Sequence, residues 1–195
     1  YLTRDNSQTL LKWQGRRFSL IPTKGIPGAF LVNDNLLSAM KKCEKRFFMG
    51  LLYIGTTNGH GNALVMEKSK AGTWELSRFE PHGAHPSKYD SDAVDTSFRD
   101  FFQKNPQYEV TSYVAPSQFC AQNGPQRTAD CFDFFDFLEK REDRKDRGWC
   151  QVISTMFIHF RLAFPNHSIV EVERMLSGKD PHQLATEIRS YTNSI

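Results

Sequence analysis

Three strand-like runs separated by short turns, between residues 47 and 80, constrain the fold more than any other feature of the sequence. Phe47 to Ile54 is continuously apolar, and His60 to Glu67 and Trp74 to Glu80 follow it. Each run has the length of an ordinary strand and is bounded by glycine or polar residues. Because a tight turn joins antiparallel neighbours, we expect the second and third runs to pair as a hairpin around Lys68 to Gly72.

Helical patterns surround these strands, and Tyr108 to Val114 alternates as a further strand does. The most apolar helical segment is Cys150 to Phe164, which Pro165 ends. Residues 116–130 resemble a loop, and residues 132–147 an excursion over the surface that is partly helical. The order of elements predicts an α+β fold with a mainly antiparallel sheet. The expected helices cover residues 33–45, 95–104, 150–164, 168–176 and 181–191.

Length and charge limit the possible classes of protein. The 195 residues suit a single domain with a substantial core. A net charge of +3 does not by itself indicate a nucleic-acid partner. No apolar run reaches the ~18 residues of a membrane helix, and no secretory signal is visible at the start. We therefore expect a monomer without a membrane partner, and, because the chain begins at Tyr1, a fragment or a processed chain.

The four cysteines favour free thiols over a metal site or a disulfide framework. They show no C-x-x-C pairing and no regular spacing with histidine, so zinc has little support and we expect neither a metal nor a cofactor. A chain of this size does not need disulfide bonds to fold, which favours reduced thiols in a cytosolic setting. The cysteines are Cys43, Cys120, Cys131 and Cys150.

Cys150 stands at the start of the most apolar expected helix. A thiol becomes more acidic at a helix N-terminus, because the helix dipole and the free N–H groups stabilise the thiolate. Gly148 would let the backbone approach a substrate carbonyl closely. A small buried residue at a helix start also explains Cys150, so this position alone leaves both interpretations open.

His60 and Glu80 are candidates for the base and the orienting acid that a thiol nucleophile uses. In the expected hairpin, the start of one strand lies beside the end of the other, which places His60 next to Glu80. A carboxylate there would hold one imidazole tautomer. The alternatives are a turn histidine exposed to water and a surface salt-bridge acid. His82 and His85, just after Glu80, are weaker candidates for the base or for metal ligands.

The hairpin resembles a segment of the adenovirus and SUMO-specific protease clan. In that clan, a histidine strand and a turn are followed by a strand that ends in Phe-Glu-Pro-x-Gly. Here Arg78 to Gly83 reads Arg-Phe-Glu-Pro-His-Gly, and His60 precedes it at the start of the previous strand. The stretch His60-Gly61-Asn62 also resembles the His-x-Asn of proteases from large DNA viruses.

The helix that begins at Cys150 carries the second part of the resemblance. Gly148-Trp149-Cys150 leads to an Arg-Leu-x-x-Pro end at Arg161 to Pro165, as in the same viral proteases. The chain order His, Glu, Cys fits this clan and differs from the papain order, in which the cysteine comes first. The resemblance implies a papain-like cysteine protease fold with a triad of His60, Glu80 and Cys150.

The oxyanion-hole residue departs from the family pattern. These families carry a glutamine just before the cysteine, but residues 144–147 contain none. We expect Gln126 to take this role, with residues 131–147 inserted before Cys150; Gln122 is the alternative, and Gln126 as a plain loop residue remains open. The alternating charges of residues 139–147 predict a solvated helix face, with a lid or docking element as the alternative.

A second departure is Gly61, where the family often has tryptophan after the histidine. From this we expect a more open cleft wall at that position.

The resemblance implies hydrolysis of peptide or isopeptide bonds after small residues, often Gly-Gly. The implied substrates are ubiquitin, ubiquitin-like conjugates or viral structural precursors, in the host cytoplasm or nucleus or in the virion. His60 would deprotonate Cys150, Glu80 would orient His60, and Gln126 with the Cys150 amide would hold the oxyanion.

Two alternatives belong to other classes of protein. A YopJ-type acetyltransferase uses His, Glu and Cys in the same order, but it needs an inositol-phosphate site, and the sequence shows no concentrated basic patch. A module that keeps the fold and binds a ubiquitin-like protein without catalysis is the other.

Overall fold

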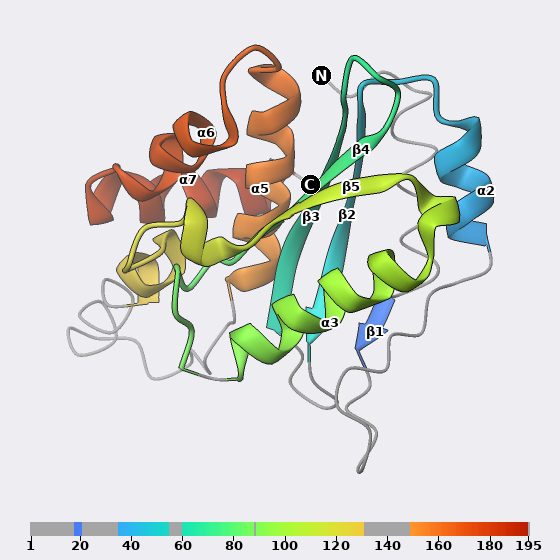
Figure 1. The fold of residues 1–195 in the computed structure, drawn as a ribbon. Helices are drawn as coiled ribbons and strands as arrows, with labels where there is room; N and C mark the ends of the chain where they lie inside the picture. The colour runs from blue at the N-terminus through green and yellow to red at the C-terminus, as the bar shows by residue number, and fades with distance from the viewer. Residues whose placement is uncertain (1–17, 21–34, 55–59, 88, 131–148, 195) are drawn as a thin grey trace.

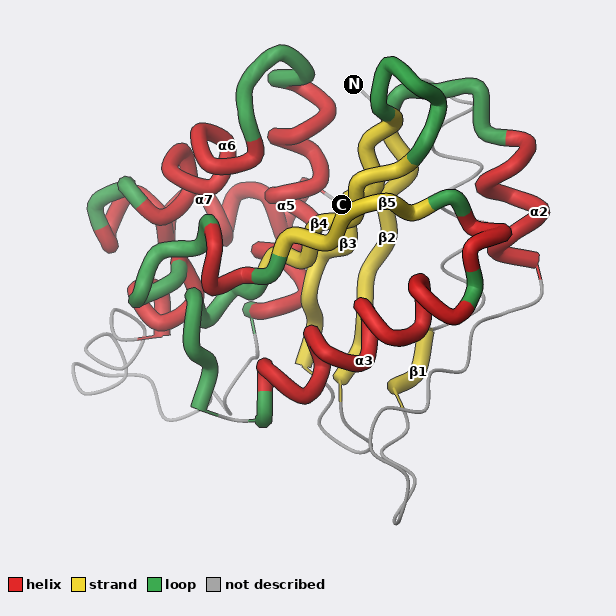
Figure 2. Tube along the Cα trace, in the orientation of Figure 1, coloured by secondary structure: helices red, strands yellow, loops and turns green. Residues whose placement is uncertain are grey.

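The computed structural model describes residues 18–20, 35–54, 60–87, 89–130 and 149–194. It is an α+β structure in which helices cover both faces of a five-stranded sheet (Figure 1, Figure 2). The strands are β1 (Phe18–Leu20), β2 (Phe47–Ile54), β3 (His60–Lys68), β4 (Trp74–Phe79) and β5 (Val110–Val114). The helices are α2 (Asn35–Lys42), α3 (Ser91–Lys104), α5 (Cys150–Ala163), α6 (Ile169–Ser177) and α7 (Pro181–Ser194), with 3₁₀ turns at Pro106–Tyr108 and Pro116–Gln118.

The strands follow chain order across the sheet, but their directions are mixed. β2 pairs with β3 and β3 with β4 in antiparallel directions, whereas β1 on β2 and β5 on β4 are parallel. The prediction of a mainly antiparallel sheet was therefore wrong for the two outer pairs. The physical reason is that each outer pair is joined by a long segment that carries a helix, and such a crossover returns the chain in the same direction.

The hairpin of β3 and β4 is confirmed. Ala63 faces Phe79 and Lys68 faces Trp74 across the ladder. The turn between them uses Gly72 at φ 84°, a left-handed conformation that glycine adopts without strain. The start of β3 consequently lies at the same end of the sheet as the residues that follow β4.

Both faces of the central strands are covered by apolar side chains. One core joins alternate strand residues such as Val65 and Phe79 to α5, α6 and α7. The other joins Leu64 and Leu76 to α2 and α3. Because β3 is buried on both faces, its sequence is nearly continuously apolar after Asn62 rather than alternating.

Two helix boundaries show where local capping decides. α3 begins at Ser91, four residues earlier than predicted, because the Asp90 carboxylate accepts a hydrogen bond from the Ala93 N–H at 2.9 Å. Asp180 caps α7, because its carboxylate accepts a hydrogen bond from the N–H of His182 at 2.9 Å. In the predicted loop 116–130, residues 125–130 are helical. The predictions for residues 33, 34 and 131–148, including Cys131 and the charged run, lie outside the described residues.

Two properties of the described residues bear on the expected class of protein. None of the helices in the described ranges is long and apolar enough to cross a membrane. Cys43, Cys120 and Cys150 are not in disulfide bonds.

Replacing Phe157 by alanine should test the contact between α5 and the sheet. The fully buried Phe157 ring stacks on Phe79 with centroids 4.0 Å apart, so Phe157→Ala should lower the free energy of unfolding by about 3–5 kcal/mol. Phe164→Ala is the control, because that side chain is 40% exposed and should cost no more than about 1 kcal/mol. Equal midpoints in urea for the two variants would contradict the packing described here.

Candidate active site

Cys150 lies where the first turn of α5 meets the start of β3. The Ser154 hydroxyl donates to the Gly61 carbonyl at 3.1 Å, and this hydrogen bond links α5 to β3. A Cβ on Gly61 would lie 3.2 Å from the Gln151 Cα and 3.3 Å from its nitrogen. The expectation of an open cleft wall at Gly61 was therefore wrong, because the backbone of α5 occupies that side. Glycine here allows the helix N-terminus to approach β3.

His60 lies between Glu80 and Cys150. Its Nε2 is 2.5 Å from Glu80 Oε1, which confirms the side-by-side placement predicted from the hairpin. The imidazole also forms a hydrogen bond with the Cys150 side chain. Because Glu80 engages Nε2, Nδ1 is the ring nitrogen available to the thiol. The structure thus brings together three of the residues chosen from the sequence.

The pKa values of the thiol and the imidazole move in opposite directions. Burial would lower the pKa of His60, but hydrogen bonds and charge interactions with Cys150 and Glu80 outweigh burial and raise this pKa to about 9. Burial would raise the pKa of Cys150, but the His60 ring and the N–H groups of Gly61 and Gln151 outweigh it and lower the pKa. Both shifts favour a thiolate beside an imidazolium over the neutral thiol–imidazole pair.

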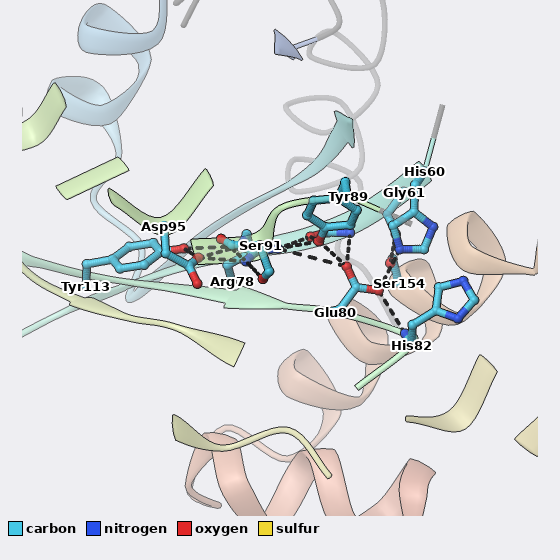
Figure 3. Close-up of polar contacts among 11 residues, drawn as sticks. His60, Gly61, Arg78, Glu80, His82, Tyr89, Ser91, Asp95, Tyr113 and Ser154 are labelled. Carbon is cyan, nitrogen blue, oxygen red and sulfur yellow. Dashed lines mark hydrogen bonds and ion pairs between the residues drawn. The ribbon is translucent and has the colours of Figure 1, made fainter. Parts of the chain in front are cut away.

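Glu80 is fully buried, and hydrogen bonds compensate its charge. It accepts from Asn62 Nδ2 at 2.8 Å. It also accepts from the His82 N–H at 2.8 Å and from the Tyr89 hydroxyl (Figure 3). Burial would raise the pKa of this carboxyl, but the hydrogen bonds from His60, Tyr89 and His82 lower it instead. Glu80 is therefore ionised, and its carboxylate lies in hydrogen-bond contact with the imidazole of His60.

Gln126 lies beside the turn that follows Glu80. Its N–H donates to the Pro81 carbonyl at 2.9 Å, at the start of the helical residues 125–130. Its side chain is 1% exposed, and its Oε1 has no hydrogen-bond partner within the described part of the chain. Gln122, the alternative, is exposed. The buried glutamine is thus held against the segment that carries Glu80, and its amide retains unused hydrogen-bonding capacity.

Two glycines make this contact possible. A Cβ on Gly124 would lie 2.3 Å from the Pro81 carbonyl oxygen, and a Cβ on Gly83 would lie 2.5 Å from that of Ala121. Gly83 also has a φ of 106°. Only glycine lets the two backbones approach so closely, which explains the Gly of the Glu-Pro-His-Gly motif in physical terms.

The other histidines chosen from the sequence have different surroundings. The His82 ring lies 4.8 Å from the His60 ring, and its main-chain N–H serves Glu80. His85 is exposed, and its carbonyl accepts from Arg127 at 2.9 Å. Among the described residues, no cluster of three His, Cys, Asp or Glu side chains could hold a metal ion.

Sequence reasoning gave no role to Asn62, Arg78 and Tyr89, whose side chains lie next to the Glu80 carboxylate. Asn62 and Arg78 lie in the quoted motifs, and their polar side chains in otherwise apolar strands were the available signal. Tyr89 follows the Glu-Pro-His-Gly turn in a polar segment and carried no comparable signal.

Comparison with known proteins leaves the family of this chain open. No protein-family model matches the sequence, and no curated protein matches it at a significant level.

The coupling of Cys150 to His60 should be visible in a pH titration. Thiolate absorbance, taken against Cys150→Ala as the blank, should appear with a midpoint below the ordinary thiol pKa of about 8.5. His60→Ala should raise the pKa of Cys150 toward that ordinary value, because its strongest hydrogen-bond partner is gone. In the native protein the imidazolium should persist until the pH rises through about 9.

The exposed histidine provides the control for this titration. His85→Ala should leave the thiolate curve unchanged, because His85 does not contact the site. An identical curve for His60→Ala and the native protein would show that the two side chains are not coupled.

Proposed function

We propose that this chain is a cysteine protease of the papain-like fold, with Cys150 as nucleophile, His60 as base and Glu80 as the orienting acid. One observation carries the proposal: a thiol at a helix N-terminus forms a hydrogen bond with an imidazole that a buried carboxylate holds from the other side. This combination of an acidified thiol, a base and an orienting group is what nucleophilic acyl transfer requires.

The reaction would begin with the Cys150 thiolate attacking the carbonyl carbon of a peptide or isopeptide bond. The carbonyl π electrons move to oxygen, and the tetrahedral oxyanion collapses to a thioester as the protonated His60 gives its proton to the leaving amine. His60 then takes a proton from water, whose oxygen attacks the thioester. Collapse of the second intermediate releases the carboxylate product and returns the thiolate–imidazolium pair.

Two features support an oxyanion hole beside Cys150. The first N–H groups of a helix have no intrahelical acceptor, and the Cys150 amide stands at the start of α5. The buried Gln126 amide, held by Pro81, offers a second donor if its nitrogen faces the substrate. The oxygen and nitrogen of a glutamine amide can exchange places by a simple flip.

The substrate class rests on the resemblance of the motifs, with one supporting property of the site. Cys150 is only 7% exposed, so a substrate chain must be slender next to the scissile bond. Small residues such as Gly-Gly fit that restriction. We therefore propose ubiquitin-like conjugates or viral precursors with a small-residue cleavage site as substrates.

Electrophilic probes provide the decisive experiment. Ubiquitin and ubiquitin-like proteins that end in a C-terminal electrophile, with a panel of Gly-Gly precursor peptides, should label or be cleaved by the native chain and not by Cys150→Ala. Activity that survives in Cys150→Ala would refute the proposal. Transfer of acetyl from acetyl-CoA to a protein acceptor, without hydrolysis, would favour the acetyltransferase alternative.

The two glutamines offer a matched test of the oxyanion hole. Gln126→Ala should lower kcat by about 10²–10³-fold, as loss of one oxyanion donor does. Gln122→Ala should leave kcat unchanged, because that side chain is exposed on the same segment. Equal effects of the two substitutions would remove Gln126 from the mechanism.

A further inference from the structure

We propose that Asn62 and Tyr89 are positioning residues whose hydrogen-bond donors Arg78 directs toward Glu80, and that this arrangement keeps Glu80 ionised and aimed at His60. The inference deepens the proposed function, since it concerns the acid of the same site.

Arg78 is a buried cation with two oxygen acceptors on the side of Glu80. Its Nη1 donates to Asn62 Oδ1 at 2.6 Å. It also donates to the Tyr89 hydroxyl oxygen at 2.6 Å (Figure 3). A guanidinium has five N–H donors and no acceptor. Both oxygens that face Arg78 must therefore accept, whatever else they do.

This requirement sets the direction of the other two hydrogen bonds. With Oδ1 of Asn62 on Arg78, the amide nitrogen must point away from it, and it lies 2.8 Å from Glu80 Oε2. Tyr89 has a single proton, and its shorter contact is with the same Oε2, whereas Asn62 Oδ1 lies at 3.2 Å. Arg78 thus fixes the amide orientation of Asn62 and leaves the Tyr89 proton for Glu80.

Arg78 acts on Glu80 mainly through these two residues. The distance from its Nη1 to Glu80 Oε2 is 3.9 Å, too long for a hydrogen bond. The guanidinium gives its Nε and Nη2 to Asp95 Oδ1 at 2.8 and 2.7 Å. Asp95 therefore balances the charge of Arg78 and leaves Glu80 to balance His60.

The titratable and charged side chains that face Glu80 come from four parts of the chain. His60 comes from β3, Arg78 from β4, and Tyr89 from the segment before α3. The fourth is Cys120, after the 3₁₀ turn Pro116–Gln118, whose thiol accepts from the Glu80 main chain. Burial raises the pKa of Cys120, so it stays neutral and adds no charge. Asn62 and Tyr89 are thus the two neutral side chains that donate to the buried carboxylate.

Two tyrosines allow a matched test. Tyr89 and Tyr113 are both half-buried, and the hydroxyl of each accepts from Arg78, but only Tyr89 reaches Glu80, whereas Tyr113 donates to Asp95. The readout is the pKa of the Glu80 carboxyl, from carbon NMR of protein labelled at glutamate and assigned with Glu80→Gln. Tyr89→Phe should raise this pKa by about one unit, the effect expected from one lost hydrogen bond to a charged group. Tyr113→Phe should leave it unchanged.

Asn62→Asp is the second variant, because it keeps the size of the side chain and the acceptor toward Arg78. It replaces the donor toward Glu80 by a second carboxylate, so the carboxyl pKa should rise further than in Tyr89→Phe. The pH at which alkylation of Cys150 falls off on the acid side should be higher in both variants than in the native protein, because protonation of Glu80 removes the charge that stabilises the imidazolium. Circular dichroism should show both variants to be folded.

The outcomes separate this proposal from the proposed function. An unchanged Glu80 pKa in both Tyr89→Phe and Asn62→Asp, or equal shifts in Tyr89→Phe and Tyr113→Phe, would overturn the positioning role even if the native chain cleaves its probes. Conversely, a selective shift in Tyr89→Phe would support the positioning role even if no probe is cleaved, because neither NMR nor alkylation needs a substrate.

Discussion

The ionised carboxylate of Glu80, buried beneath the imidazole of His60, is the interaction on which the site depends. A buried charge is costly unless donors and an opposite charge surround it. Here the donors come from segments that only the folded chain brings together: Asn62 from β3, the His82 amide from the turn after β4, and Tyr89 from the segment before α3. The same carboxylate raises the pKa of His60, which in turn lowers that of Cys150. The acidity of the thiol is therefore a property of the whole cluster.

The second requirement is that α5 begin against β3, because its first turn carries the thiol. The contact between Ser154 and Gly61 fixes this position along the strand, and the stacked rings of Phe157 and Phe79 hold the next turns on the sheet. A Cβ at position 61 would lie 3.2 Å from the Gln151 Cα, so the helix N-terminus would have to shift by a few tenths of an ångström to admit it. A glycine that suggested an open cleft in the sequence thus has the opposite role in the structure, since it lets two backbones meet where the thiol and the imidazole must interact.

Local features of the sequence predicted what local physics decides. The β3–β4 hairpin and the neighbouring positions of His60 and Glu80 followed from a tight turn and strand periodicity. The meeting of Cys150 with His60 did not, since ninety residues separate them and no periodicity reports on so distant a contact; the motif resemblance supplied it. Tyr89 escaped notice for the same reason: a single tyrosine in a polar segment becomes significant only when the start of α3 is placed against the end of β4.

The direction of β5 explains how that placement arises. In an antiparallel meander, a short turn would follow β4 and the chain would return at once along its edge. Instead, β5 runs parallel to β4, so the chain must first cross back over the sheet, and α3 is that crossover. The crossover starts at the end of β4, which puts Tyr89 and Ser91 beside Glu80 and Arg78, and it returns as β5, which puts Tyr113 against Asp95. The polar network around Glu80 is thus a consequence of the parallel β4–β5 pair, one of the two outer pairs whose direction the strand pattern did not predict.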